Sequence, residues 1–389
     1  MQAESNRVDI RISEETAWAE VPSSPTMAVL PYTSEGLIYD KRTVKSNIVR
    51  ADRLTDDIVE VGAGSNGDLN IEYKFGDFEK LIEGALGSKF VTNTATYTGS
   101  GGAGDLSFAV SGGGVQVITG PASTWNNFDV GAYVRVSGAT QSANNGVFRI
   151  TAITSTDLTV TNAAGVSENN STATVSQKMA RTGVNKYSYL IEKSFGDITQ
   201  FLSFRGLRVA TWAMNVEAEQ IVTGSFGFMG EGVYAAGSTI SGAITPASSN
   251  SIASATANVG RLEEGGATLT TAIKAVRFNL NANPRQLTAV ANKFPIGINL
   301  GSFEITGSVE AYFEDLALYN KFVNHSDSSL VLEIDSPEDD RTIITITNLK
   351  FTNGNPVGAG LNQDVMVTMD FTAKNDAVSQ SMMQVDLLT

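Results

Sequence analysis

The residue types that most often carry catalysis or hold metals are scarce in this chain. It contains no cysteine and a single histidine, His325. Thiolate sites and sites built from several histidines are therefore excluded, and the inventory argues against Ser-His-Asp and Cys-His catalysis. We expect His325 to be a surface residue that follows a helix.

Two other patterns could suggest ligand binding, but both lack the spacing that binding needs. The glycine runs near 99–104 and 112–114 are not followed by Gly-Lys-Ser/Thr and do not open a helix, so we expect no phosphate loop there. The acidic turn at 336–341 lacks the ligand spacing and the glycine of an EF-hand. We therefore expect no cofactor, no metal and no enzymatic activity.

The composition is that of an acidic globular protein rich in strands and turns. The 389 residues carry a formal net charge of −14, with 42% hydrophobic and only 17% charged residues. The sequence shows no Lys/Arg cluster for gripping phosphates. The charged opening predicts no signal peptide, and no window approaches 18 unbroken apolar residues, so we expect no membrane span.

One stretch, residues 67–88, organises the rest of the chain. Its first half alternates, with Leu69 and Ile71 on one face and polar residues on the other, as in a strand with one solvated side. The spacing then changes to a helical stripe that includes Phe78 and Leu81, with Asp77 placed to cap its start and Gly87 to end it. We expect this unit to fold as a strand followed by a short packed helix.

A similar unit returns from residue 301, with Phe313 and Leu316 expected on the buried face of its helix. The strands that follow each unit also come in the same order. We therefore predict a mainly β protein with two tandem β-sandwich or barrel domains, each with a short α-helix, and a small inserted all-β domain. The predicted parts are a first domain at 1–91 and 181–234 with an N-terminal arm, an insert at 92–180, an extended linker at 235–274 and a second domain at 275–389.

Several of these segments together resemble the tail tube proteins of long, non-contractile-tailed bacteriophages. The similarity covers ISEETAWAEVPSSPTMAVLPYTSEGL, SNIVRADRLTDD, GDLNIEYKFGDFEKLIEGAL, YLIEKSFGDITQFLSFRGLRVATWAMNV and GSFEITGSVEAYFEDLALYNKF, in the family's order. The insert departs from a minimal tube protein and resembles the small β domains that phage structural proteins display on their outer surface.

The resemblance implies a structural protein of the virion tail, synthesised in the host bacterial cytoplasm. Its subunits would close into rings that stack into a tube, through which viral double-stranded DNA passes without sequence-specific binding. With two copies per chain, the expected ring is a homotrimer with pseudo-sixfold symmetry. The resemblance also implies contacts with other tail proteins, namely the tape measure, tail terminator and distal tail proteins. An acidic wall would let DNA slide, because it does not hold phosphates by counterion release.

Two groups of residues are candidates for these roles. The lumen-lining candidates lie on polar strand faces: Asp68, Asn70, Glu72, Lys74, Glu217, Glu219, Thr223, Glu304, Thr306, Ser308, Asp364, Thr368 and Asp370. The candidates for contacts between rings lie in two long loops: Arg50, Asp52, Arg53, Asp56, Asp57, Arg285 and Lys293. Loops well above the usual length of about 4–6 residues are often functional.

Three alternatives remain open from the sequence. The chain could be a host-binding or glycan-binding module of the virion surface, with the insert as the recognising part, or the inner tube of a contractile injection system. A polysaccharide-cleaving enzyme is the third alternative, but a sequence alone cannot place two carboxylates at catalytic separation.

Overall fold

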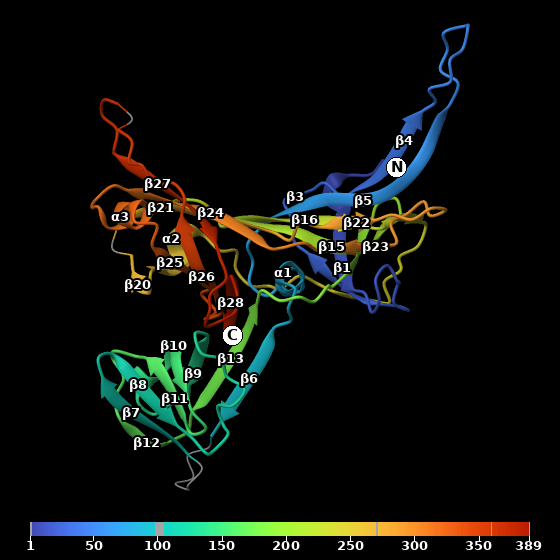
Figure 1. Cartoon of the computed structure of the whole chain (residues 1–389). Helices are drawn as coiled ribbons and strands as arrows, with labels where there is room; N and C mark the ends of the chain where they lie inside the picture. Colours follow the sequence, from blue (N-terminus) through green and yellow to red (C-terminus); the bar gives the residue numbers. More distant parts are fainter. Residues whose placement is uncertain (1, 98–104, 270, 359, 389) are drawn as a thin grey trace.

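The computed structural model describes residues 2–97, 105–269, 271–358 and 360–388. Within these residues the protein is mainly β, as predicted, and its α-helices are short: α1 (Glu79–Leu86), α2 (Ala255–Asn258) and α3 (Ala317–Val323). Most of the strands join in one continuous hydrogen-bonded network. Figure 1 shows long strands running across the middle of the molecule, with further strands packed below them.

The strands of the N-terminal half pair in a definite order. The central strand β5 (Ile58–Glu72) pairs with β16 (Thr223–Gly230), which pairs with the second part of β15 (Gln200–Glu217). The first part of β15 turns away and pairs with β14 (Tyr189–Phe195) on one side and β17 (Gly232–Ala236) on the other. β1 (Val8–Glu14) then adds to β14.

The strands of the C-terminal half repeat this order of pairings. Here β24 (Glu304–Tyr312) pairs with β27 (Met366–Ala373), which pairs with the end of β26 (Arg341–Phe351). The first part of β26 pairs with β25 (Asp327–Asp335) and β28 (Met383–Leu388), and β19 (Val259–Glu264) adds to β25. Each half thus has a long strand that is shared between two layers.

The two halves meet edge to edge in one sheet. β15 pairs with β21 (Ile273–Asn281) over residues 211–217, and β21 pairs in turn with β24. At the other margin, β3 (Ser34–Glu35) and β4 (Ile38–Lys45) pair with β5. The resulting sheet, here called the long sheet, runs β3/β4, β5, β16, β15, β21, β24, β27, β26, with four strand positions from each half.

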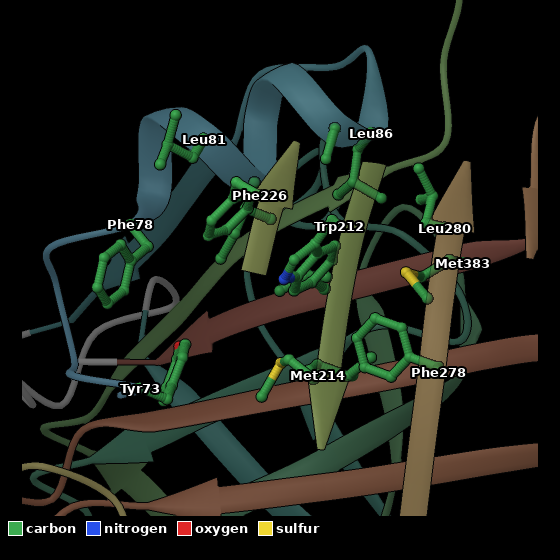
Figure 2. Packing of buried hydrophobic residues seen from close by; sticks show 14 of the residues in the cluster. Tyr73, Phe78, Leu81, Leu86, Trp212, Met214, Phe226, Phe278, Leu280 and Met383 are labelled. Carbon is green, nitrogen blue, oxygen red and sulfur yellow. The ribbon is translucent and has the colours of Figure 1, made fainter. Parts of the chain in front are cut away.

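The core lies beneath the long sheet, because each strand turns alternate apolar side chains to the same side. Figure 2 shows Trp212 between Phe226 and Phe278, below helix α1. The Trp212 ring stacks on Phe226 at 6.0 Å and meets Phe278 edge-on at 5.1 Å between ring centroids. The expected burial of Phe78, which immediately precedes α1, and of Leu81 within α1 is confirmed.

The helix ends agree only in part with the prediction. Gly87 ends α1 in the left-handed conformation, with φ of 67° and its N–H donated to the Glu83 carbonyl. Asp77 does not cap the helix, because its carboxylate accepts hydrogen bonds from the Ser248 N–H and hydroxyl instead. The predicted burial of Leu316 is wrong: α3 begins after it, and Leu316 is 54% exposed. Phe313 is half-buried against the core.

Short elements fill the segments on either side of these halves. They are η1 (Ser5–Arg7), β2 (Thr26–Leu30), β18 (Ala243–Thr245), β20 (Ala267–Thr268), β22 (Arg285–Leu287) and β23 (Gly297–Asn299). The segment 235–274, expected to be extended, runs alongside both halves. β18 pairs with β2, Ile252 bridges to Lys74, and β19 joins the C-terminal half.

Residues 92–180, here called the inserted segment, have a buried cluster of their own around Trp125 and Phe108. Their elements are β6 (Val91–Thr96), β7 (Leu106–Gly112), β8 (Val115–Thr119), β9 (Tyr133–Ser137), η2 (Ser142–Asn144), β10 (Gly146–Ile153), β11 (Asp157–Thr161), β12 (Glu168–Ser171) and β13 (Thr174–Arg181). β13 also pairs with β28. In Figure 1 this segment lies below β28, whereas the β4–β5 hairpin projects upward on the opposite side.

Candidate functional surface: the polar face of the long sheet

The face of the long sheet that points away from the core is polar. The pairing register aligns one residue from each strand position into a row across the sheet. In order across the strands, this row reads Ser34, Asn70, Ser225, Ala213, Asn279, Thr306, Thr372 and Lys350. Small neutral polar side chains therefore dominate the middle of this face.

Charges on this face are mostly negative. Arg277 donates to Glu217 at 2.9 Å and lies 3.5 Å from Glu310, which also binds Lys274 at 3.1 Å. The hydrogen bond that Lys274 donates to Glu310 raises the pKa of Lys274. Among the described residues, four further carboxylates on or beside this face form no ion pair: Asp68, Glu72, Glu304 and Asp370. The cations are thus neutralised locally, and an acidic surplus remains.

The polar face is also hollowed. An open trough of about 570 Å³ lies over the middle strands, with Asn70, Asn215, Ser225, Asn279 and Thr306 along its walls. These residues come from both halves of the chain. The trough therefore crosses the β15–β21 junction rather than belonging to one half.

Most of the predicted lumen-lining residues lie on this face. The strands carry Asp68, Asn70, Glu72, Glu217, Thr223, Glu304, Thr306, Ser308, Thr368 and Asp370 there. Three candidates lie elsewhere. Lys74 follows the end of β5 and pairs with Asp77 at 4.0 Å, Glu219 occupies a tight turn at φ of 63°, and Asp364 precedes β27 in an exposed loop.

The sequence reasoning missed several residues of this face, including Asn215, Ser225, Arg277, Asn279 and Glu310. All of them alternate with buried apolar residues such as Trp212, Met214, Phe278 and Val309. The same period-two test that identified residues 67–75 would have found them in 211–217, 223–230, 275–281 and 304–312.

The predicted contact residues at 50–57 lie at the tip of a long hairpin. We call residues 38–61, which comprise β4, the turn and the start of β5, the arm; this hairpin is distinct from the predicted N-terminal arm. Arg50 donates to Asp52 at 3.0 Å and to Asp56 at 2.7 Å, and these bonds raise the pKa of Arg50 and lower that of Asp52. Arg53 turns the chain at φ of 63°. The predicted open loop is thus a hairpin with an internally paired tip.

The other two predicted contact residues lie in residues 282–303, which we call the second loop. Arg285 begins β22 and is exposed. Lys293 forms an ion pair with Glu60 of the arm at 2.9 Å, which lowers the pKa of Glu60. Lys293 is therefore already engaged within its own chain.

Other kinds of site find little support in the part of the chain that the structure describes. No group of three or more His, Cys, Asp or Glu side chains there is arranged to hold a metal ion. No helix there is long and apolar enough to cross a membrane. The glycine run at 112–114 forms the turn between β7 and β8, and the run near 99–104 lies outside the described residues. His325 follows α3, as predicted, with φ of 50°.

Comparison with known proteins agrees with the segments that the sequence resemblance used. No curated protein is significantly similar to the chain. The family model described as phage tail tube protein matches residues 5–373, which is nearly the whole chain and includes every strand of the long sheet. The chain therefore belongs to the phage tail tube protein family.

Proposed function

We propose that three copies of this chain close into a ring and that rings stack into the tail tube, which conducts the viral genome into the host. Membership of the family gives the structural role in the phage tail. The ring itself is supported by the likeness of the two halves and by the way they join in the long sheet.

The first step is the equivalence of the two halves. β5, β16 and β15 in the first half match β24, β27 and β26 in the second, in order and direction of pairing. The outer strands β1, β14 and β17 likewise match β19, β25 and β28. We therefore infer two tandem copies of one tube domain, with the inserted segment in the first copy only.

The second step is the junction between the copies, which is the observation that carries the proposal. The last strand of copy one, β15, pairs with the first strand of copy two, β21, from Thr211 opposite Asn281 to Glu217 opposite Ala275. Among the described residues, the outer edge of β4 pairs with no other strand, whereas β25 occupies the outer edge of β26 as far as Lys350. The same junction formed between chains would therefore join β3/β4 of one chain to the segment that follows Lys350 in its neighbour.

The third step is closure. Three chains with four strand positions per copy would supply roughly 24 strands, and at a spacing of about 4.8 Å with barrel tilt the backbone circle is about 35–50 Å wide. Closure would remove exposed sheet edges, which otherwise promote aggregation. Because the core and the inserted segment lie on the other side of the sheet, the polar face would line the lumen.

The test is direct imaging and a mass measurement. We expect the purified chain to form rings and hollow cylinders in negative-stain micrographs, with three chains per ring by light scattering or native mass spectrometry. A sample that stays monomeric at high concentration would contradict the ring. Six chains per ring would contradict the role of the duplication.

A further inference from the structure

The chain already shows how one copy reaches over the next. The second loop of copy two lies on the base of the arm of copy one, where the Ala63 N–H donates to the Lys293 carbonyl at 2.9 Å. The Lys293 ammonium pairs with Glu60 at 2.9 Å, and the ring of Phe294 packs 6.1 Å from that of Tyr234. The contact combines backbone, charge and ring packing.

The arm is the counterpart of the second loop. Each connects the first two strands of its copy and leaves the same end of the long sheet, beside Asn66 in one case and beside Asn281 in the other. The second loop belongs to copy two and contacts copy one of the same chain. The arm belongs to copy one, which has no copy before it in the chain, so Val49 is left 96% exposed and both Ile48 and Leu54 are left 64% exposed.

A hollow lies at the base of the second loop. An open hollow of about 570 Å³ lies there, between Asn283, Pro284 and Arg285 on one side and Gly301 and Ser302 on the other. In copy two, these residues occupy the place that the base of the arm occupies in copy one, and the second loop covers that base. Arg285 is exposed and, among the described residues, has no ion-pair partner, so it offers a positive charge to arm carboxylates such as Asp57, which likewise forms no ion pair there.

We propose that the arm of each chain docks into the hollow at the base of the second loop of the neighbouring chain in the same ring. This inference rests on the proposed function, since it needs a neighbour. At one end of the ring, each copy would then contact the copy that precedes it. The second loop would make this contact within a chain, and the arm would make it between chains. The exposed apolar side chains at the arm tip would be covered, and the arm carboxylates would lie near Arg285 of the neighbour.

The contact inside the chain favours a neighbour in the same ring over a chain in the next ring. Lys293 and Glu60 join copies that lie side by side in one sheet, and the arm stands in the same relation to the copy that would adjoin β3/β4. In addition, Arg50 is neutralised by Asp52 and Asp56 within the arm tip. The tip therefore combines charges that are largely paired internally with the exposed apolar side chains of Ile48, Val49 and Leu54, which a hollow could cover.

Because the chain has no cysteine, paired substitutions give a clean test. Leu54→Cys with Ser302→Cys, oxidised after assembly, should give disulfide-linked species of two and three chains on a denaturing gel and nothing larger, because a ring of three closes on itself. Val49→Cys with Asn283→Cys repeats the test with other positions. Leu54→Cys with Val378→Cys is the matched control, since Val378 is 79% exposed and lies beside Val130 and Arg149 of the inserted segment.

Three results would overturn the inference, and they separate it from the ring. A ladder that continues past three chains would show that the arm joins successive rings. Rings of normal mass without cross-links in either pair would show that the arm docks elsewhere. Reduced variants and the unaltered chain that both stay monomeric would contradict the ring, and with it the neighbour that this contact requires.

Discussion

Asp386 lies where the inserted segment meets the C-terminal half, and its carboxyl is fully buried. Desolvation raises its pKa to about 7, although the carboxyl accepts hydrogen bonds from Gln384 at 2.7 Å and from the Tyr133 N–H at 3.1 Å. Arg181 and Arg149 also lie close enough to favour the charged form. Burial outweighs these contacts, so the carboxyl is a site where pH acts on stability.

This pKa predicts a falling stability as the solution becomes more basic. The folded carboxyl holds its proton more tightly than the unfolded one, whose pKa is near 3.8, so the free energy of unfolding falls between about pH 4 and 7 and then levels off. The size is on the order of 4 kcal/mol as an upper bound. Asp386→Asn should flatten this dependence in urea unfolding followed across that range, and an unchanged slope would contradict the assignment.

Gly84 is a second residue whose role depends on its surroundings. It lies in α1, where alanine would normally stabilise a helix by about 1 kcal/mol. A Cβ at this position would come within 2.7 Å of the Tyr189 ring and 2.9 Å of Val209. We therefore expect Gly84→Ala to destabilise the protein by about 1–3 kcal/mol through overpacking. Lys80→Ala, on the exposed side of the same helix, is the control, and a rise in Tm for Gly84→Ala would contradict the close approach.

At this scale the sequence predicted side-chain faces better than positions near strand ends. Alternation placed Asp68, Asn70 and Glu72 on one face because a strand has a fixed period of two. Lys74 broke the pattern because β5 ends at Glu72, and the bridge to Ile252 in a segment far along the chain cannot be read from spacing.

Among the elements, the arm is the clearest case of a structure that looks incomplete in a single chain. A hairpin of two strands is marginally stable by itself, and this one exposes apolar side chains along its length. Since the proposed neighbour would bury Val49, Val49→Asp should leave the fold of the monomer unchanged and weaken assembly at least tenfold, measured by sedimentation. Val184→Asp, equally exposed, should leave assembly unaltered. Equal effects of the two substitutions would argue against the arm as a contact.

Elements were predictable where periodicity was long and strong. The strand and helix of residues 67–86 were found because both patterns extend over several residues. The extent of the arm was not, since residues 62–66 are Gly, Ala, Gly, Ser and Asn and do not alternate, and pairing with β4 makes residues 58–66 a strand. The start of α3 was also misplaced, because Leu316 has the right spacing for a buried helix face but lies just before the helix.

For the whole molecule, the acidic surplus on the polar face gives a prediction about DNA. Glu72→Lys with Asp370→Lys would replace two unpaired carboxylates by ammonium groups on the proposed lumen wall. We expect tubes of this variant to retain double-stranded DNA at low salt and to release it as salt rises, because phosphate contacts depend on counterion release. Glu338→Lys, in the turn at 336–340 away from this face, is the control. Equal DNA retention by both variants would contradict an inward polar face.

The inserted segment gives a second prediction at this scale. Thr96 and Thr174 are directly paired across β6 and β13, so a two-residue Asn-Gly turn can replace residues 97–173. The deletion would expose Val331, Ile343 and Leu388, which now pack against Tyr133 and Val147, so Tm should fall. Rings should still form, whereas loss of assembly with an intact fold would show that the segment belongs to the wall.

The overall organisation was partly readable from the sequence. The order of matching segments suggested two similar units, and composition set the insert apart. The joining of both units in one sheet could not be predicted, because the residues that pair between β15 and β21 lie 58 to 70 positions apart and no local pattern specifies that partner.

This junction also bears on how fast a ring could assemble. In the proposed trimer, half of the seams would form inside a chain while it folds, at an effective concentration in the millimolar range set by the tether between the copies. Of the remaining three seams, two would depend on encounters between separate molecules, and the third would close the ring. Nucleation would thus need two encounters, against five for a ring of six separate domains, and the two copies could evolve apart without losing their partner.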